Sequence, residues 1–158
     1  MQQMNELIPP TQDRVRDNTA RAVNSNIDTR IAENIRVYST QSNQAISEHI
    51  RELNKEWDIE RLLERNASTI VIIGTILGAF VNQWFLLIPG LVGVFLLQHA
   101  LQGWCPPLPI FRRMGKRTRN EIDMEKFAMK ALRGDFDQLE TIRDRISRAN
   151  CVIDAVRD

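Results

Sequence analysis

Apolar and charged positions are sharply separated along this chain of 158 residues. Residues 66–111 contain no Asp, Glu, Lys or Arg, whereas charged side chains are frequent on both sides of this stretch. A transmembrane helix needs about 20 apolar residues, so the stretch is long enough for two helices joined by a tight turn. The pattern predicts spans at about 66–82 and 84–104, within a transmembrane hairpin that covers residues 58–107.

The arm that precedes the hairpin, residues 1–57, has the pattern of long helices. Neither Gly nor Pro occurs between residues 11 and 74, and from Ile27 to Trp57 most apolar side chains recur every three or four residues. This spacing places them on one face of a helix. Because so narrow a stripe does not fold alone, it predicts a partner helix from another copy or another protein. The alternative is a partly disordered arm, with its weakest stretch at 39–44. A break near 24–26 would divide the arm, so one helix and two helices both remain open.

Residues 108–158 are predicted to form two more helices, at about 119–133 and 136–157. Thr118 and Glu121 have the spacing of a capping box, and Gly134 is placed to end the helix that they begin. The last helix carries apolar residues at the alternating three–four spacing of a coiled-coil seam: Leu139, Ile142, Ile146, Ala149, Ile153 and Val156. The expected fold is therefore that of an all-α integral membrane protein, a two-helix transmembrane hairpin with long helical arms at both ends.

Small residues within the two spans predict close packing of helices. Gly74 and Gly78 lie four residues apart on the first span, and Gly90 and Gly93 lie on the second. In lipid, small side chains allow two helix backbones to approach closely. These glycines are expected either to pack the hairpin against itself or to form a seam in a homo-oligomer. The two interpretations are compatible.

The distribution of charge predicts the orientation of the hairpin. Arg61 and Arg65 precede the first span, and a cluster of Arg and Lys follows the second, whereas the turn between the spans has no charge. Since basic residues accumulate on the cytoplasmic side, both arms and both termini are expected in the cytoplasm. The net charge is +1, with acidic and basic residues interleaved. This pattern favours no nucleic-acid partner, so the expected partners are the lipid bilayer and other membrane subunits.

The segment from Asp58 to Pro107, about a third of the chain, resembles the YgaP-like transmembrane domain family. The resemblance rests on a Glu-Arg flank, a glycine-bearing first span, and three later motifs: Trp84-Phe85, Leu96-Leu97-Gln98 and Gly103-Trp104-Cys105-Pro106. It implies a small hairpin of the bacterial inner membrane that tends to self-associate. Fusion of some members to a rhodanese domain implies sulfur handling. The N-terminal arm here is too short and too helical to be a rhodanese, so no sulfurtransferase activity is carried over.

Cys105 is the candidate reactive thiol, because Arg112 and Arg113 follow it and nearby positive charge lowers a thiol pKa. The resemblance implies that it could carry persulfide sulfur, while haem ligation and acylation are further uses of such a cysteine. The alternative is a small buried residue that ends the helix. Gln98, His99 and Gln102 form a candidate intramembrane polar site. A lone histidine is a weak ligand, so no cofactor or metal is expected.

The sequence favours a non-catalytic protein. It contains no glycine-rich phosphate loop, metal-spaced cluster or nucleophile–base pair, so an enzyme is not expected. The first hypothesis is a small inner-membrane scaffold or accessory subunit that self-associates or joins a larger membrane complex. The second is a sulfur-trafficking or redox partner that uses Cys105. The third is an oligomeric transport pore.

Overall fold

The structure, a computed structural model, describes residues 14–157, and only the backbone of residues 140 and 157. The regular elements within this range are all helices, which confirms the predicted all-α class. Two compact units are distinct: Met1–Ile27 with Trp57–Arg119, here called the hairpin unit, and Asp28–Glu56 with Asn120–Asp158, here called the arm unit. The first 13 residues of the predicted N-terminal arm lie outside the described residues.

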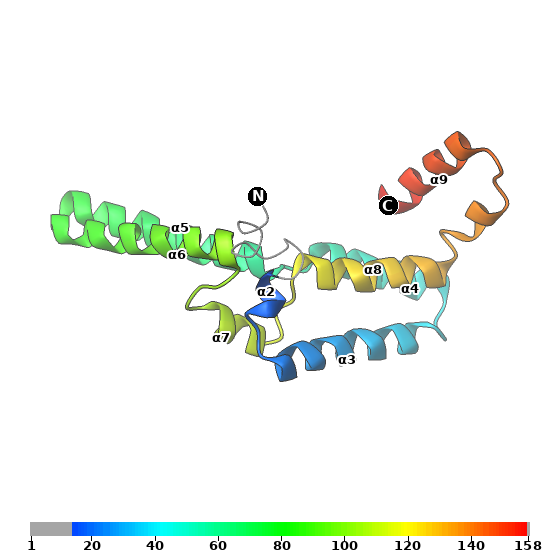
Figure 1. Cartoon of the computed structure of the whole chain (residues 1–158), viewed down its shortest axis with the longest axis horizontal. Coiled ribbons are helices and arrows are strands. Elements are labelled where there is room, and N and C mark those ends of the chain that lie inside the picture. Colours follow the sequence, from blue (N-terminus) through cyan, green and yellow to red (C-terminus); the bar gives the residue numbers. More distant parts are fainter. Residues whose placement is uncertain (1–13, 158) are drawn as a thin grey trace, which may run out of the picture. The chain divides into compact units, whose positions relative to one another are not determined.

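The hairpin unit is built around α5 (Ile59–Phe80) and α6 (Leu87–Gln102), which are joined by the 3-10 helix η1 (Gln83–Leu86) (Figure 1). At 1.5 Å per residue, the 22 residues of α5 extend about 33 Å and the 16 of α6 only about 24 Å. The four residues of η1, which directly precede α6, add roughly 8 Å to the length of the second span. Both helical segments are long and apolar enough to cross a membrane, as the predicted transmembrane hairpin requires.

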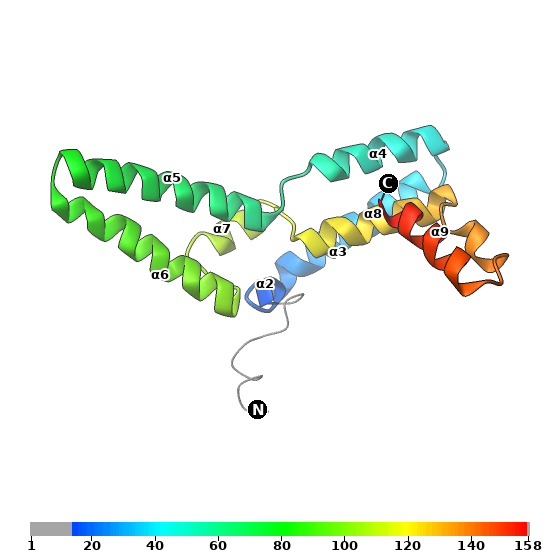
Figure 2. The same ribbon diagram turned by 90° about the horizontal axis from the view of Figure 1, so that it is seen from above.

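The end of the hairpin that bears residues 59 and 102, here called the base, has its own core. There α5 begins at Ile59, earlier than the predicted span, because the Asp58 carboxylate accepts the backbone N–H of Arg61 at 2.8 Å and caps the helix. The two membrane helices spread apart toward the base (Figure 2). The base core joins side chains of α2 (Arg14–Asp17), α5, residue 105 and α7 (Leu108–Arg113): Val15, Ile59, Leu63, Cys105 and Leu108.

The arm unit has a core between α4 (Asn43–Lys55) and α8 (Arg119–Arg133), with the C-terminal part of α3 (Arg21–Tyr38) packed against it. Its buried side chains are Ile46, Ile50 and Leu53 of α4 and Ile122 and Met129 of α8. The apolar stripe of the N-terminal arm therefore has its partner helix within the same chain. The expectation of a partner from another molecule is corrected, because periodicity shows which face must be buried but not which helix covers it.

Helix boundaries in the arms agree with the sequence in part. The bounds of α8 coincide with the predicted 119–133, and α3 runs unbroken through 24–26, where the sequence had left a break open. The chain turns instead at 39–42, where the Ser42 hydroxyl accepts the N–H of Ala45 at 3.3 Å and caps α4.

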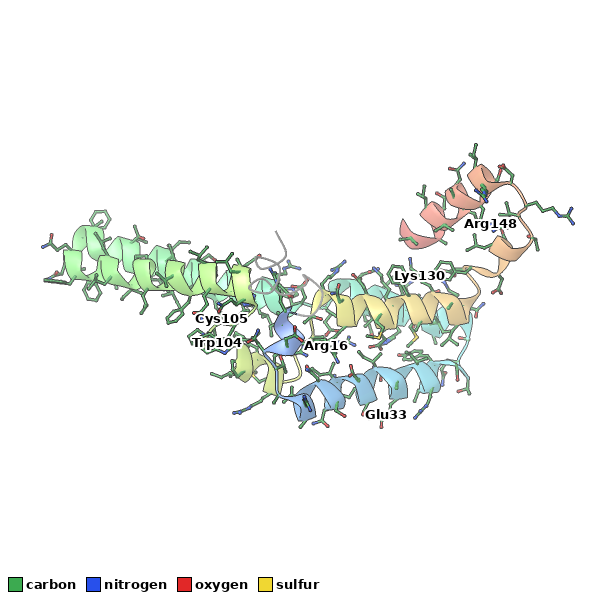
Figure 3. The ribbon with its side chains drawn as sticks, viewed as in Figure 1. Arg16, Glu33, Trp104, Cys105, Lys130 and Arg148 are labelled. Carbon is green, nitrogen blue, oxygen red and sulfur yellow. The ribbon has the colours of Figure 1, made fainter. Side chains whose placement is uncertain are left out.

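The predicted helix over 136–157 is divided into η2 (Asp137–Glu140) and α9 (Arg145–Arg157). The physical reason is a second cap: the Asp144 carboxylate accepts the backbone N–H of Ser147 at 2.8 Å, which begins a new helix after the turn. The fully buried side chain of Lys130 in α8 joins α8 to α9, because its ammonium donates a hydrogen bond to the Ala155 carbonyl at 2.9 Å (Figure 3).

Candidate functional site

Gly74 and Gly78 pack the hairpin against itself. A Cβ atom added to Gly74 would lie 2.8 Å from Cδ of Pro89 and 3.3 Å from Cβ of Ile88. One added to Gly78 would lie 2.5 Å from Cδ2 of Leu86. Since ordinary carbon–carbon contacts are about 3.5–4.0 Å, neither position has room for a side chain. Gly74 and Gly78 therefore agree with the first interpretation, close packing of the hairpin against itself.

Gly90 and Gly93 are placed differently. Beyond the backbone of its own helix and the adjacent residues, a Cβ added to either would meet no atom of the described residues within 4 Å. Leu87, Gly90, Val94 and Leu97 alternate at three and four residues and so share one side of α6. The side chains of Leu87, Val94 and Leu97 are 62–65% exposed. We call this side the open face of α6, and it is left for lipid or for another helix.

Cys105 lies in the base core and is only 5% exposed, close to Trp104 just after α6 (Figure 3). Burial raises the pKa of its thiol, and the backbone N–H of Leu108 opposes this in part. The sequence had suggested the opposite direction, with the pKa lowered by Arg112 and Arg113. A raised pKa leaves less of the nucleophilic thiolate at neutral pH. The geometry therefore agrees with the alternative, a small buried residue after the helix.

Arg112 explains why that suggestion fails. Its side chain is 1% exposed, and its guanidinium donates to the Thr19 hydroxyl at 3.2 Å, the Asn24 amide oxygen at 2.8 Å and the Lys116 carbonyl at 3.0 Å. Thr19 lies just before α3 and Asn24 near its start, so the first two of these bonds join α7 to the beginning of α3 within the hairpin unit. In the sequence, Arg112 is one of several basic residues that follow the second span. Nothing there indicated that its side chain is buried and joins α7 to α3.

The predicted polar site of Gln98, His99 and Gln102 is not one cluster. Gln98 is half-buried and Gln102 is exposed, with its backbone carbonyl accepting from the Asn18 side-chain amide at 2.7 Å. His99 is 8% exposed, and both of its ring nitrogens are buried without a hydrogen-bond partner among residues 14–157. Of the three, His99 lines the cavity described next.

That cavity lies at the base of the hairpin and has a volume of about 530 Å³. One wall is α5 between residues 63 and 70, and the opposite wall is α6 between residues 91 and 99. Residues 105–107 and Phe111 close it on a further side. Its volume lies within the 300–1,000 Å³ that is usual for small-molecule sites.

The arm unit contains a buried polar cluster that the sequence did not indicate. The fully buried Glu125 carboxylate lies 2.8 Å from Nε2 of His49 and accepts the Asn34 amide at 2.9 Å. The ring of Tyr38 stacks on that of His49 at 4.2 Å between centroids. The sequence pattern did not single out His49, although one signal was present. Its spacing of three residues from Ile46 and four from Leu53 was the available signal, because it places His49 on the buried face of α4.

The six residues of the predicted oligomer seam do not share one helix. Leu139 lies on η2 and Ile142 in the turn that follows, both half-buried. Ile146, Ala149, Ile153 and Val156 lie on α9 and are exposed, Ile146 most of all at 73%. The described residues also contain no group of three His, Cys, Asp or Glu that could hold a metal ion.

Comparison with known families supports the membrane part of this description. Residues 61–121 match the family described as "Inner membrane protein YgaP-like, transmembrane domain". The match extends beyond the segment 58–107 that carried the resemblance, and it includes α7 and the start of α8. Comparison with curated proteins and with solved structures gave no significant match. Over somewhat more than a third of its length, the chain is thus similar to the transmembrane domain of YgaP-like inner membrane proteins.

Proposed function

We propose that this protein is a non-catalytic scaffold or accessory subunit of the bacterial inner membrane, which self-associates through its hairpin. The observation that carries the proposal is the open face of α6. A glycine that faces lipid makes almost no packing contact, whereas at a helix–helix interface it allows the second backbone to come close. Gly90 has open space around it and lies between exposed apolar residues, as the centre of such an interface would.

The orientation with both arms in the cytoplasm is part of this proposal. The guanidinium carbons of Arg61 and Arg65 lie 4.3 and 5.4 Å from the centre of the Trp57 ring, just before the first span. Basic and aromatic side chains at one depth are typical of the headgroup region, and an excess of basic residues marks the cytoplasmic side. At the other end, the exposed Trp84 provides an aromatic anchor beside a turn without charge.

The two other functional hypotheses have less support. A sulfur or redox role requires an accessible thiolate, and Cys105 is buried with a raised thiol pKa. A pore between copies that meet through the open face would need polar groups there. His99, the one ionisable side chain in the predicted spans, faces the cavity instead.

Photo-crosslinking in native membranes tests the scaffold. A photoreactive phenylalanine analogue placed at Val94 on the open face should give cross-linked dimers. The same analogue at Ile72, which is 59% exposed on α5, is the matched control and should give fewer. Gly90→Leu should reduce the dimer because it fills the space that the second helix needs. Only monomers at both positions, together with a single-chain mass on native gels, would refute self-association.

A further inference from the structure

We propose that the cavity at the base of the hairpin binds a neutral amphiphile of the quinone class, with His99 donating or accepting a hydrogen bond at one of its oxygens. The proposal concerns binding at a site within a single hairpin. It does not rest on the scaffold role, and self-association and ligand binding can fail separately.

The cavity selects an uncharged and largely apolar ligand. Its described lining includes Leu63, Ala67 and Ile70 from α5 and Val92, Phe95 and Leu96 from α6. The described lining contains no Asp, Glu, Lys or Arg, and its only ionisable side chains are His99 and Cys105. Placing a charged molecule there would remove its hydration without an opposite charge in return. Because both walls are membrane helices, the ligand is one that dissolves in the bilayer.

His99 indicates that the ligand also has polar atoms. Buried polar groups in proteins almost always have a hydrogen-bond partner, and a neutral imidazole offers one donor and one acceptor. The described residues leave both nitrogens of this buried ring unpartnered. His99 forms part of the cavity wall, so a ligand in the cavity lies beside this ring. An acyl chain would fill the volume but would satisfy neither nitrogen.

A second polar group on the opposite wall favours a ligand with two oxygens. Asn66 of α5 lines the cavity across from His99 of α6 and brings an amide that can donate or accept. A quinone ring has carbonyl oxygens at opposite ends of a flat apolar body, and its quinol form has hydroxyls there. Such a molecule can fill an apolar cavity while it hydrogen-bonds to both walls. A phospholipid tail cannot.

The test uses the full chain in nanodiscs of phosphatidylethanolamine and phosphatidylglycerol. Decylubiquinone is added, and quenching of tryptophan emission is corrected with nanodiscs that lack protein. We expect saturable binding that His99→Leu weakens about tenfold, the effect of one buried hydrogen bond, and that His99→Gln largely restores. Gln98→Leu, on the same helix but outside the cavity lining, should leave binding unchanged. Ala67→Phe should abolish binding because it fills the cavity.

Decylbenzene, which keeps the ring and tail but lacks the oxygens, separates polar recognition from filling of an apolar space. It should compete poorly for the site, and its competition should not depend on His99. Equal competition by decylbenzene, an unchanged Kd in His99→Leu, or the absence of saturable binding would each overturn the proposal. Far-UV circular dichroism and gel filtration of each variant show that its hairpin is folded, and the Gln98→Leu and His99→Gln proteins remain informative if His99→Leu is not.

Discussion

Replacement of Gly74 by alanine should weaken the packing of the transmembrane hairpin. The added Cβ would lie 2.8 Å from Cδ of Pro89. To restore a contact of about 3.5–4.0 Å, the helices must separate by roughly 0.7–1.2 Å at this point. The proline ring is part of the α6 backbone and has no rotamer that moves it away, so the helix itself must shift. Overpacking of this kind costs about 1–3 kcal/mol.

A gain in helix propensity offsets little of this cost. Alanine is favoured over glycine by about 1 kcal/mol in a water-exposed helix, but this gain counts only if the helix unfolds. Membrane helices keep their backbone hydrogen bonds when they separate from each other, because lipid offers no alternative partners. The net loss in the free energy of hairpin association is therefore expected to stay near about 1–3 kcal/mol.

The assay is an SDS titration of the protein in dodecylmaltoside micelles, followed by tryptophan emission. Gly74→Ala should shift the midpoint to lower SDS. Gly93→Ala is the matched control, because it adds the same methyl group on the neighbouring helix, at a position outside the open face where no described atom beyond the helix's own backbone and the adjacent residues lies within 4 Å. Its effect should stay within about 0.5 kcal/mol. Equal stability of Gly74→Ala and wild type, or an equal loss in both variants, would refute the reasoning.

Three further predictions concern the base and the arms. Arg112→Ala should destabilise the protein by about 1–3 kcal/mol for each buried acceptor that loses its donor, whereas the exposed neighbour Arg113→Ala should have little effect in the same SDS titration. Ile50→Ala in the arm core should cost about 2–5 kcal/mol in thermal unfolding followed by circular dichroism, and Ile146→Ala, on an exposed face, less than about 0.5 kcal/mol. Because burial raises the thiol pKa of Cys105, its alkylation by N-ethylmaleimide should be several-fold slower at pH 7 than in the SDS-unfolded protein. The rate should keep rising with pH after that of the unfolded thiol has levelled off, and equal rates in both states would contradict the burial.

The hairpin was predictable from the sequence because it follows from composition. A stretch without charge between dense charges can satisfy its backbone only as helices in lipid, so two spans and their turn could be assigned directly. The capping-box spacing that begins at Thr118, together with Gly134, predicted the bounds of α8 in the same local way. What could not be predicted is which parts meet. The apolar spacing of α4 predicted that one of its faces is buried. Nothing in that spacing indicated that the covering helix is α8, which comes after the hairpin in the sequence.

The candidate site was predictable only in its residue types. His99 and Cys105 were singled out as chemically capable, yet their surroundings depend on contacts that the sequence does not state. Arg112 shows this most clearly. From its position after Cys105, the Arg112 guanidinium was expected to lower the thiol pKa. In the structure it instead donates hydrogen bonds to Thr19 and Asn24. The cavity depends on the angle between α5 and α6, which no local pattern encodes.

The pairing of α4 with α8 has a consequence for biosynthesis. His49 and Glu125, which meet in the arm unit, are 76 residues apart, and the whole hairpin lies between them. At about 5–20 residues per second, the ribosome needs roughly 4–15 s to make that interval. During this time α4 has emerged while its covering helix has not been made. Synthesis of the hairpin therefore precedes closure of the arm core, and the exposed stripe of the nascent chain needs protection from aggregation until α8 has been made.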